Sequence, residues 1–133
     1  MAAERFTEII AFSLRQVSEG NHDDPFFRLL EEKDEIIPEL IAAFRGESDS
    51  AVREFLVEVI WQHRNPSAIG FLGEALRDEA DRVWKQALDG LVTLGSRAAL
   101  DELRSAREKP FAEHRKMVEF HAWIDEAIEQ VSS

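Results

Sequence analysis

The sequence contains no cysteine, and only four prolines and six glycines occur among its 133 residues. Without cysteine the chain can form neither a disulfide framework nor a thiolate metal site, and it has no thiol nucleophile. No apolar run approaches the ~20 residues that a membrane-spanning helix needs. The amino terminus, Met1 to Arg5, lacks the basic segment followed by an apolar run that marks a signal peptide. These absences predict a cytoplasmic protein with no membrane partner.

Basic side chains are scarce relative to acidic ones. Sixteen lysines and arginines stand against 27 aspartates and glutamates, a formal net charge of −11. Such a charge repels the phosphates of nucleic acids, so we expect no nucleic-acid partner. It favours either solubility alone or the attraction of a basic partner. An acidic patch is predicted in residues 23–39, formed by Asp23, Asp24, Glu31, Glu32, Asp34, Glu35 and Glu39.

Residues 97–116 are rich in bases instead, with six lysines and arginines against four acids. Because the bases alternate with acids, we interpret this segment as a solvated face or as an intramolecular partner for the acidic patch, rather than as a DNA site.

Motifs that carry catalysis or hold a cofactor are absent as well. The sequence has no HExxH zinc motif, no GxSxG elbow, no glycine-rich phosphate loop and no dinucleotide fingerprint. The four histidines are dispersed, whereas metal ligands must converge on one point. The serines cluster at expected turns and helix caps, where their hydroxyls satisfy backbone groups. We therefore predict no catalytic residue, no metal, no cofactor and no enzymatic activity.

The chain does have internal repetition. The segment Ile37 to Arg45, followed by residues 51–56, is matched about 31 residues later by Ile69 to Arg77, followed by residues 82–87. A third opening, residues 98–103, falls at the same interval. Apolar residues recur at helical spacing throughout, and a period of ~20–50 residues is typical of stacked helical pairs. The sequence predicts an all-α fold, a short right-handed α-solenoid with capping helices at both ends.

We expect one domain over residues 1–133. Its predicted parts are N-terminal capping helices in 1–33, repeat 1 in 34–65, repeat 2 in 66–96, and repeat 3 in 97–133. Repeat 1 should pair helices 35–45 and 50–63, and repeat 2 should pair helices 66–77 and 80–94. A long terminal helix is predicted from about Pro110 to Val131.

The second repeat resembles a HEAT repeat, of the short bacterial kind also seen in phycobilin lyases. The matching residues are Ala68, Ile69, Leu72, Ala75, Leu76, Val83, Ala87, Leu91, Leu94 and Gly95. The arginine usual after the valine is present as Arg53 in the first repeat and replaced by Trp84 in the second. The resemblance covers residues 34–106 and implies an armadillo-like superhelix. It does not imply one activity, because the family includes scaffolds, inhibitors, lyases and DNA-repair glycosylases.

Second helices usually line the inner face of a HEAT solenoid, and aromatic residues there are typical binding anchors. The candidate binding residues are Arg53, Trp61, Trp84, Lys85 and Asp89. For Trp84, packing between helices is the interpretation favoured over partner contact, and for Trp61 and Trp123 it is favoured more strongly.

Three functions remain open. The first is a scaffold or adaptor that binds a protein or peptide and is a monomer or a weak homodimer. The second is an acidic inhibitor or immunity-type protein that covers a basic site on its partner, with salt-sensitive association. The third is an enzyme subunit related to HEAT-like lyases.

Overall fold

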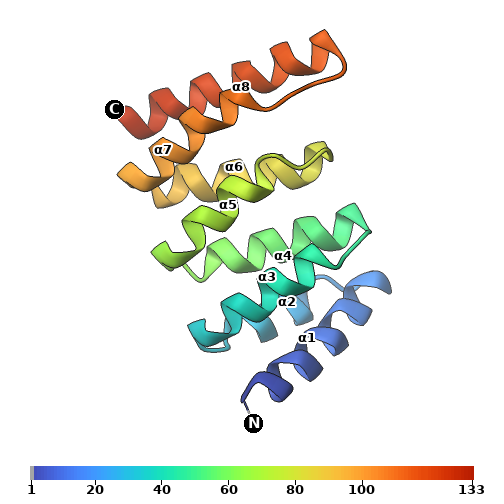
Figure 1. The fold of residues 1–133 in the computed structure, drawn as a ribbon. Helices are drawn as coiled ribbons and strands as arrows, with labels where there is room; N and C mark the ends of the chain where they lie inside the picture. The colour runs from blue at the N-terminus through green and yellow to red at the C-terminus, as the bar shows by residue number, and fades with distance from the viewer. Residues whose placement is uncertain (1) are drawn as a thin grey trace. The chain divides into compact units, whose positions relative to one another are not determined.

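The computed structural model describes residues 2–133, and all regular structure in that part of the chain is helical (Figure 1). The all-α class is therefore confirmed. The chain divides into two compact units, unit 1 (Met1–Ala68) and unit 2 (Ile69–Ser133). Within residues 2–133, no helix combines the length and the apolar character that crossing a bilayer requires.

Unit 1 consists of two helical hairpins. Helix α1 packs against α2 and α3 against α4, while α1 also lies beside α3 and α2 beside α4 (Figure 1). The first hairpin thus stacks on the second in two layers. The elements of unit 1 are α1 (Ala2–Ser18), α2 (Asp23–Leu30), the 3₁₀ turn η1 (Asp34–Ile36), α3 (Ile37–Arg45), α4 (Ser50–Gln62) and the 3₁₀ turn η2 (Pro66–Ala68).

Local sequence explains where the unit 1 helices begin. Asp49 caps α4, since its Oδ1 accepts a hydrogen bond from the Ala51 N–H at 2.8 Å. Pro38 lies in the first turn of α3, where its missing N–H costs nothing. Helix α2 begins at Asp23, with Asp23 and Asp24 both in its first turn. Acidic side chains there interact favourably with the helix dipole.

Unit 2 repeats this two-layer arrangement. Helix α5 lies beside α7 and α6 beside α8, with α5 packed on α6 and α7 on α8. The elements are α5 (Ile69–Ala75), α6 (Asp81–Leu94), α7 (Arg97–Ser105), the 3₁₀ turn η3 (Ala106–Glu108) and α8 (His114–Ser132). Leu72, Leu103, Phe120 and Ile124 are fully buried.

Two glycines serve distinct purposes in unit 2. Gly95 ends α6 in the left-handed region at φ 59°, directly after the helix predicted over residues 80–94. Gly73 on α5 lies under the carboxylate of Glu102 on α7, which occupies the place that a Cβ would take. The two helices can approach closely at this point because Gly73 has no side chain.

Two predicted helices of unit 2 need correction. The terminal helix does not start near Pro110, because α8 begins at His114 and residues 109–113 form a connection without helix. Lys109 has φ −59° and ψ 128°, the extended conformation favoured before a proline. The helix predicted over 66–77 is likewise shorter, since residues 66–68 form η2 and α5 ends at Ala75.

Candidate functional site

Four aromatic side chains of unit 2 contact one another between α6, α8 and the connection that precedes α8. Trp84 on α6 meets Phe120 edge-on at a centroid distance of 4.9 Å, and Trp123 at 6.1 Å. Phe111 lies 5.2 Å from Phe120 on the other side. These are distances at which aromatic pairs attract beyond their area burial.

Two lysines complete this group. The Lys85 ammonium lies 4.8 Å from the Trp123 ring centroid and 5.6 Å from that of Trp84. The Lys109 ammonium lies 4.6 Å from the Phe120 centroid, 4.9 Å from Phe111 and 5.8 Å from Trp84. Distances below about 6 Å are those of cation–π attraction. The aromatic–lysine cluster comprises Trp84, Lys85, Lys109, Phe111, Phe120 and Trp123.

Lys109 is almost entirely enclosed, with 8% of its surface exposed. Its ammonium donates a hydrogen bond to the Asp78 carbonyl at 2.7 Å. Burial lowers the pKa of Lys109, and the nearby carboxylates of Asp78, Asp81 and Glu79 oppose that shift. The ammonium therefore links the turn before α6 to the connection before α8, and it stabilises both.

The members of the cluster differ sharply in exposure. Trp84 is 3% exposed, and its indole N–H donates to Asp81 Oδ1 at 3.2 Å, so both its ring and its polar end have partners. Trp123 is 41% exposed and presents an open part of its ring beside Lys85. The cluster therefore has an enclosed base and one aromatic side chain that another molecule can touch.

The structure places the five predicted binding residues in different units. Arg53 and Trp61 belong to unit 1, whereas Trp84, Lys85 and Asp89 belong to α6 of unit 2. Trp61 is 7% exposed, and the burial of both predicted tryptophans favours the packing alternative for their rings.

The predicted charged residues have more varied surroundings. The Arg53 guanidinium lies 5.9 Å from the Phe44 ring and donates to the Ser48 carbonyl at 3.0 Å. Asp89 is exposed one turn after Lys85, and partial desolvation raises the pKa of its carboxyl.

Of the six cluster residues, the sequence pointed only to Trp84 and Lys85 as binding residues, and Trp123, which is 41% exposed, was expected to pack. Lys109 belongs to the basic segment 97–116, which was interpreted as solvated or as paired with the acidic patch. Phe111 and Phe120 attracted no interpretation at all. The sequence signal that could have located them is the Lys-Pro-Phe run at 109–111, since a proline favours a non-helical connection.

Part of the acidic patch in unit 1 is neutralised by internal contacts. The Arg5 guanidinium donates two hydrogen bonds to Glu32, at 3.0 and 2.9 Å. Asp23 and Asp24 contact neighbouring side chains in the loop before α2, at 3.4 and 3.3 Å. Among the described side chains, the patch members without a hydrogen bond or ion pair are Glu31, Glu35 and Glu39.

Asp34 takes part in a network with a buried histidine. Its Oδ2 accepts from Asn65 Nδ2 at 2.8 Å, and its Oδ1 lies 3.1 Å from His63 Nδ1. The other ring nitrogen of His63 lies 3.2 Å from the Leu29 carbonyl oxygen. The hydrogen bonds from Asn65 and His63 hold the pKa of Asp34 below its ordinary value. Because both ring nitrogens have partners, His63 is positioned to join α4 to the start of α3.

Comparison with known proteins identifies the family. The sequence profile described as HEAT repeats matches residues 37–119, which is more than half of the chain and includes helices of both units. No curated protein and no solved structure matches the chain. HEAT repeats form helical scaffolds that commonly mediate protein interactions. The resemblance seen in the second repeat is thereby confirmed, and the chain belongs to the HEAT repeat family.

Proposed function

We propose that the chain is a non-enzymatic scaffold that binds a protein or peptide partner, and that the surface around Trp123 makes the contact. The Trp123 surface consists of the exposed part of Trp123 and the adjoining Lys85. The observation that carries the proposal is the 41% exposure of Trp123 in a cluster whose other tryptophan is enclosed. An exposed tryptophan held in one orientation is a common anchor of protein interfaces.

The surroundings of Trp123 support this assignment. Trp84 meets Trp123 edge-on, and the Lys85 ammonium lies over its ring, so the indole is held before any partner arrives. Holding a side chain in its bound conformation reduces the entropy lost on association. Lys85 also supplies a positive charge on a chain of net charge −11, so an acidic or polar group of a partner can bind there.

The other predicted binding residues contribute less to the proposed contact than Trp123 and Lys85 do. Asp89 lies one turn from Lys85 and extends the polar edge of the Trp123 surface along α6. Trp84 supports Trp123 from beneath and does not itself reach the partner. That Arg53 and Trp61 bind a partner stays a prediction, because both residues belong to unit 1 and the Trp123 surface belongs to unit 2.

A capture experiment tests the proposal. Tagged wild-type chain, Trp123→Ala, Lys85→Ala and the control Val118→Ala are incubated with lysate of the source cells, and retained proteins are quantified. Val118 is a suitable control because it is another exposed apolar residue of α8, at 52% exposure, outside the cluster. We expect at least one protein that the wild type and Val118→Ala retain and that Trp123→Ala loses. Equal recovery with all four chains would refute the assignment.

The acidic-inhibitor alternative is supported by a separate observation. Glu31, Glu35 and Glu39 lie in unit 1 without partners among the described side chains. Under this alternative, partner affinity falls steeply with salt and depends on these three residues rather than on Trp123. The triple replacement by glutamine distinguishes the two, because it should leave binding through Trp123 unchanged.

A further inference from the structure

A shallow apolar groove of about 410 Å³ runs between α1 and α3 of unit 1. Its walls are formed by Thr7, Ile10, Ala11 and Leu14 of α1 and by Glu39, Ala42, Ala43 and Gly46 at α3. The positions follow the same i, i+3, i+4, i+7 pattern on both sides. Each wall is therefore one continuous helix face, about two turns or ~10 Å long.

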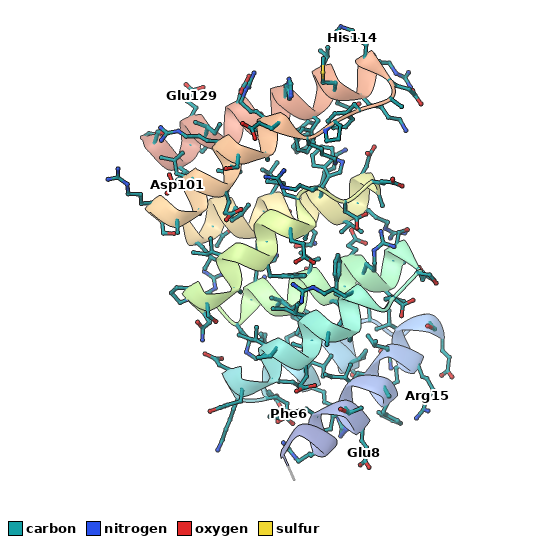
Figure 2. All side chains as sticks on the ribbon, in the orientation of Figure 1. Phe6, Glu8, Arg15, Asp101, His114 and Glu129 are labelled. Atoms are coloured by element: carbon teal, nitrogen blue, oxygen red, sulfur yellow. The ribbon has the colours of Figure 1, made fainter. Side chains whose placement is uncertain are left out.

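Most of the wall residues are small or apolar, and several are open to solvent. Ala11 and Ala42 are exposed, while Leu14 and Ala43 are half-buried. The nearby charged side chains of α1 leave the groove open, since Glu8 and Arg15 project to solvent away from α3 (Figure 2). Small side chains along both walls allow the backbone of a third helix to come close, at the spacing of ordinary helix packing.

Charge indicates what kind of helix fits. Glu39 is the single charged residue among the walls, and no described side chain lies within ion-pair distance of its half-buried carboxylate. Unit 1 as a whole carries fourteen acids and seven lysines or arginines, a net charge of −7. A cation placed at the groove would pair with Glu39 and be attracted by the surrounding field.

We propose that the α1–α3 groove is a docking site for an amphipathic helix of another protein, one that carries a lysine or arginine beside its apolar stripe. Residues spaced at i, i+3, i+4 and i+7 on that helix fill the α1–α3 groove, as in other helix-in-groove complexes. The basic residue pairs with Glu39. A second copy of this chain is disfavoured, because two chains of net charge −11 repel one another.

The probe is a blocked synthetic peptide of about 18 residues, ~27 Å long as a helix, with a leucine and alanine stripe flanked by lysines. A second peptide has glutamates in place of the lysines. Each is titrated into the isotope-labelled full chain while backbone amide shifts are followed, and affinities are measured at low and high salt. The groove shares no residue with the Trp123 surface, so binding in the groove and binding through Trp123 can fail independently; the groove shares only Glu39 with the acidic-inhibitor alternative.

Matched variants locate the binding. Ala42→Arg places a bulky cation in the groove next to Glu39, and Ala122→Arg makes the same change at an exposed alanine of α8. If Ala42→Arg does not fold, Ala11→Arg takes its place, because it blocks the α1–α3 groove from the opposite wall. Glu39→Gln removes the carboxylate and leaves the shape unchanged.

We expect the lysine peptide to shift amides of residues 7–14 and 39–46, and the glutamate peptide to shift none. Ala42→Arg should weaken binding of the lysine peptide at least tenfold, and Ala122→Arg should leave it unchanged. Glu39→Gln should weaken binding and reduce its dependence on salt. Absence of saturable binding, shifts centred elsewhere, or equal losses in the two arginine variants would overturn the proposal.

Discussion

Alanine variants of Trp84 and Trp123 distinguish a buried, supporting tryptophan from an exposed one. The Trp84 side chain is 97% buried, given its 3% exposure. Truncating a fully buried tryptophan to alanine costs about 3–5 kcal/mol. Its edge-on contacts with Phe120 and Trp123, and its hydrogen bond to Asp81, place Trp84→Ala in the upper part of that range.

Trp123→Ala is the matched comparison. With 41% of its surface exposed, Trp123 loses less burial on truncation, and scaling by buried area gives about 2 kcal/mol. For a chain of 133 residues, roughly 3–5 °C of melting temperature corresponds to each kcal/mol. We therefore expect a fall of about 12–25 °C for Trp84→Ala and of about 6–10 °C for Trp123→Ala.

Urea unfolding and thermal melts followed by circular dichroism measure both variants. Partner binding, measured at a temperature where each variant is folded, should be lost in Trp123→Ala and only weakened in Trp84→Ala, which loosens the Trp123 ring without removing it. A Trp84→Ala chain that melts within a few degrees of the wild type would refute the assignment of Trp84 as a buried support.

Three further predictions concern single side chains. Because burial lowers the pKa of Lys109, the folded state binds fewer protons than the unfolded state just below pH 10.5. The free energy of unfolding of the wild type should therefore rise relative to that of Lys109→Met as the pH rises toward 10.5. Urea titrations at several pH values measure this difference. The lowered pKa of Asp34 means that its carboxylate stabilises the fold above about pH 3.8, and this stabilisation is lost as the pH falls through the pKa of the folded state. Asp34→Asn should therefore be less stable than the wild type at neutral pH and equal to it in strong acid. Gly95→Ala places a side chain at φ 59° and should cost about 1 kcal/mol, whereas Gly70→Ala, with open space around the new Cβ, should be neutral or stabilising by up to ~1 kcal/mol in the same unfolding assay.

The helical pairs could be predicted from the sequence because their signals are local. Spacing of apolar residues identified α4 and α6, and Gly95 marked the end of α6. These features depend on a residue and its neighbours within a few turns. The repeat in residues 37–103 then indicated how consecutive pairs are related, and the family profile supports that interpretation.

The stacking of the first hairpin left no such signal. The helices in residues 1–33 share no repeated segment with the rest of the chain, yet α1 and α2 pack on α3 and α4 in the same two-layer manner. Packing of this kind depends on the shape of apolar faces, which many sequences can supply.

The candidate site was predicted only in part, because it depends on tertiary contacts. Trp84 and Lys85 were selected from their place on a second helix, and the choice between packing and partner contact needed the burial of each ring. Lys109 was missed because a basic residue in a charged segment is normally solvated. Its burial follows from the connection at 109–113, which brings it against rings from two other segments.

A site-specific photocrosslink from position 123 in the full chain tests directly whether Trp123 contacts a partner. A photoreactive phenylalanine analogue replaces Trp123 in one sample and Val118 in a matched sample, and each is irradiated in lysate of the source cells. If Trp123 makes the contact, position 123 gives a discrete crosslinked protein that position 118 does not give and that an excess of wild-type chain competes away. Crosslinks that are the same from both positions, or that no wild-type chain displaces, would contradict it.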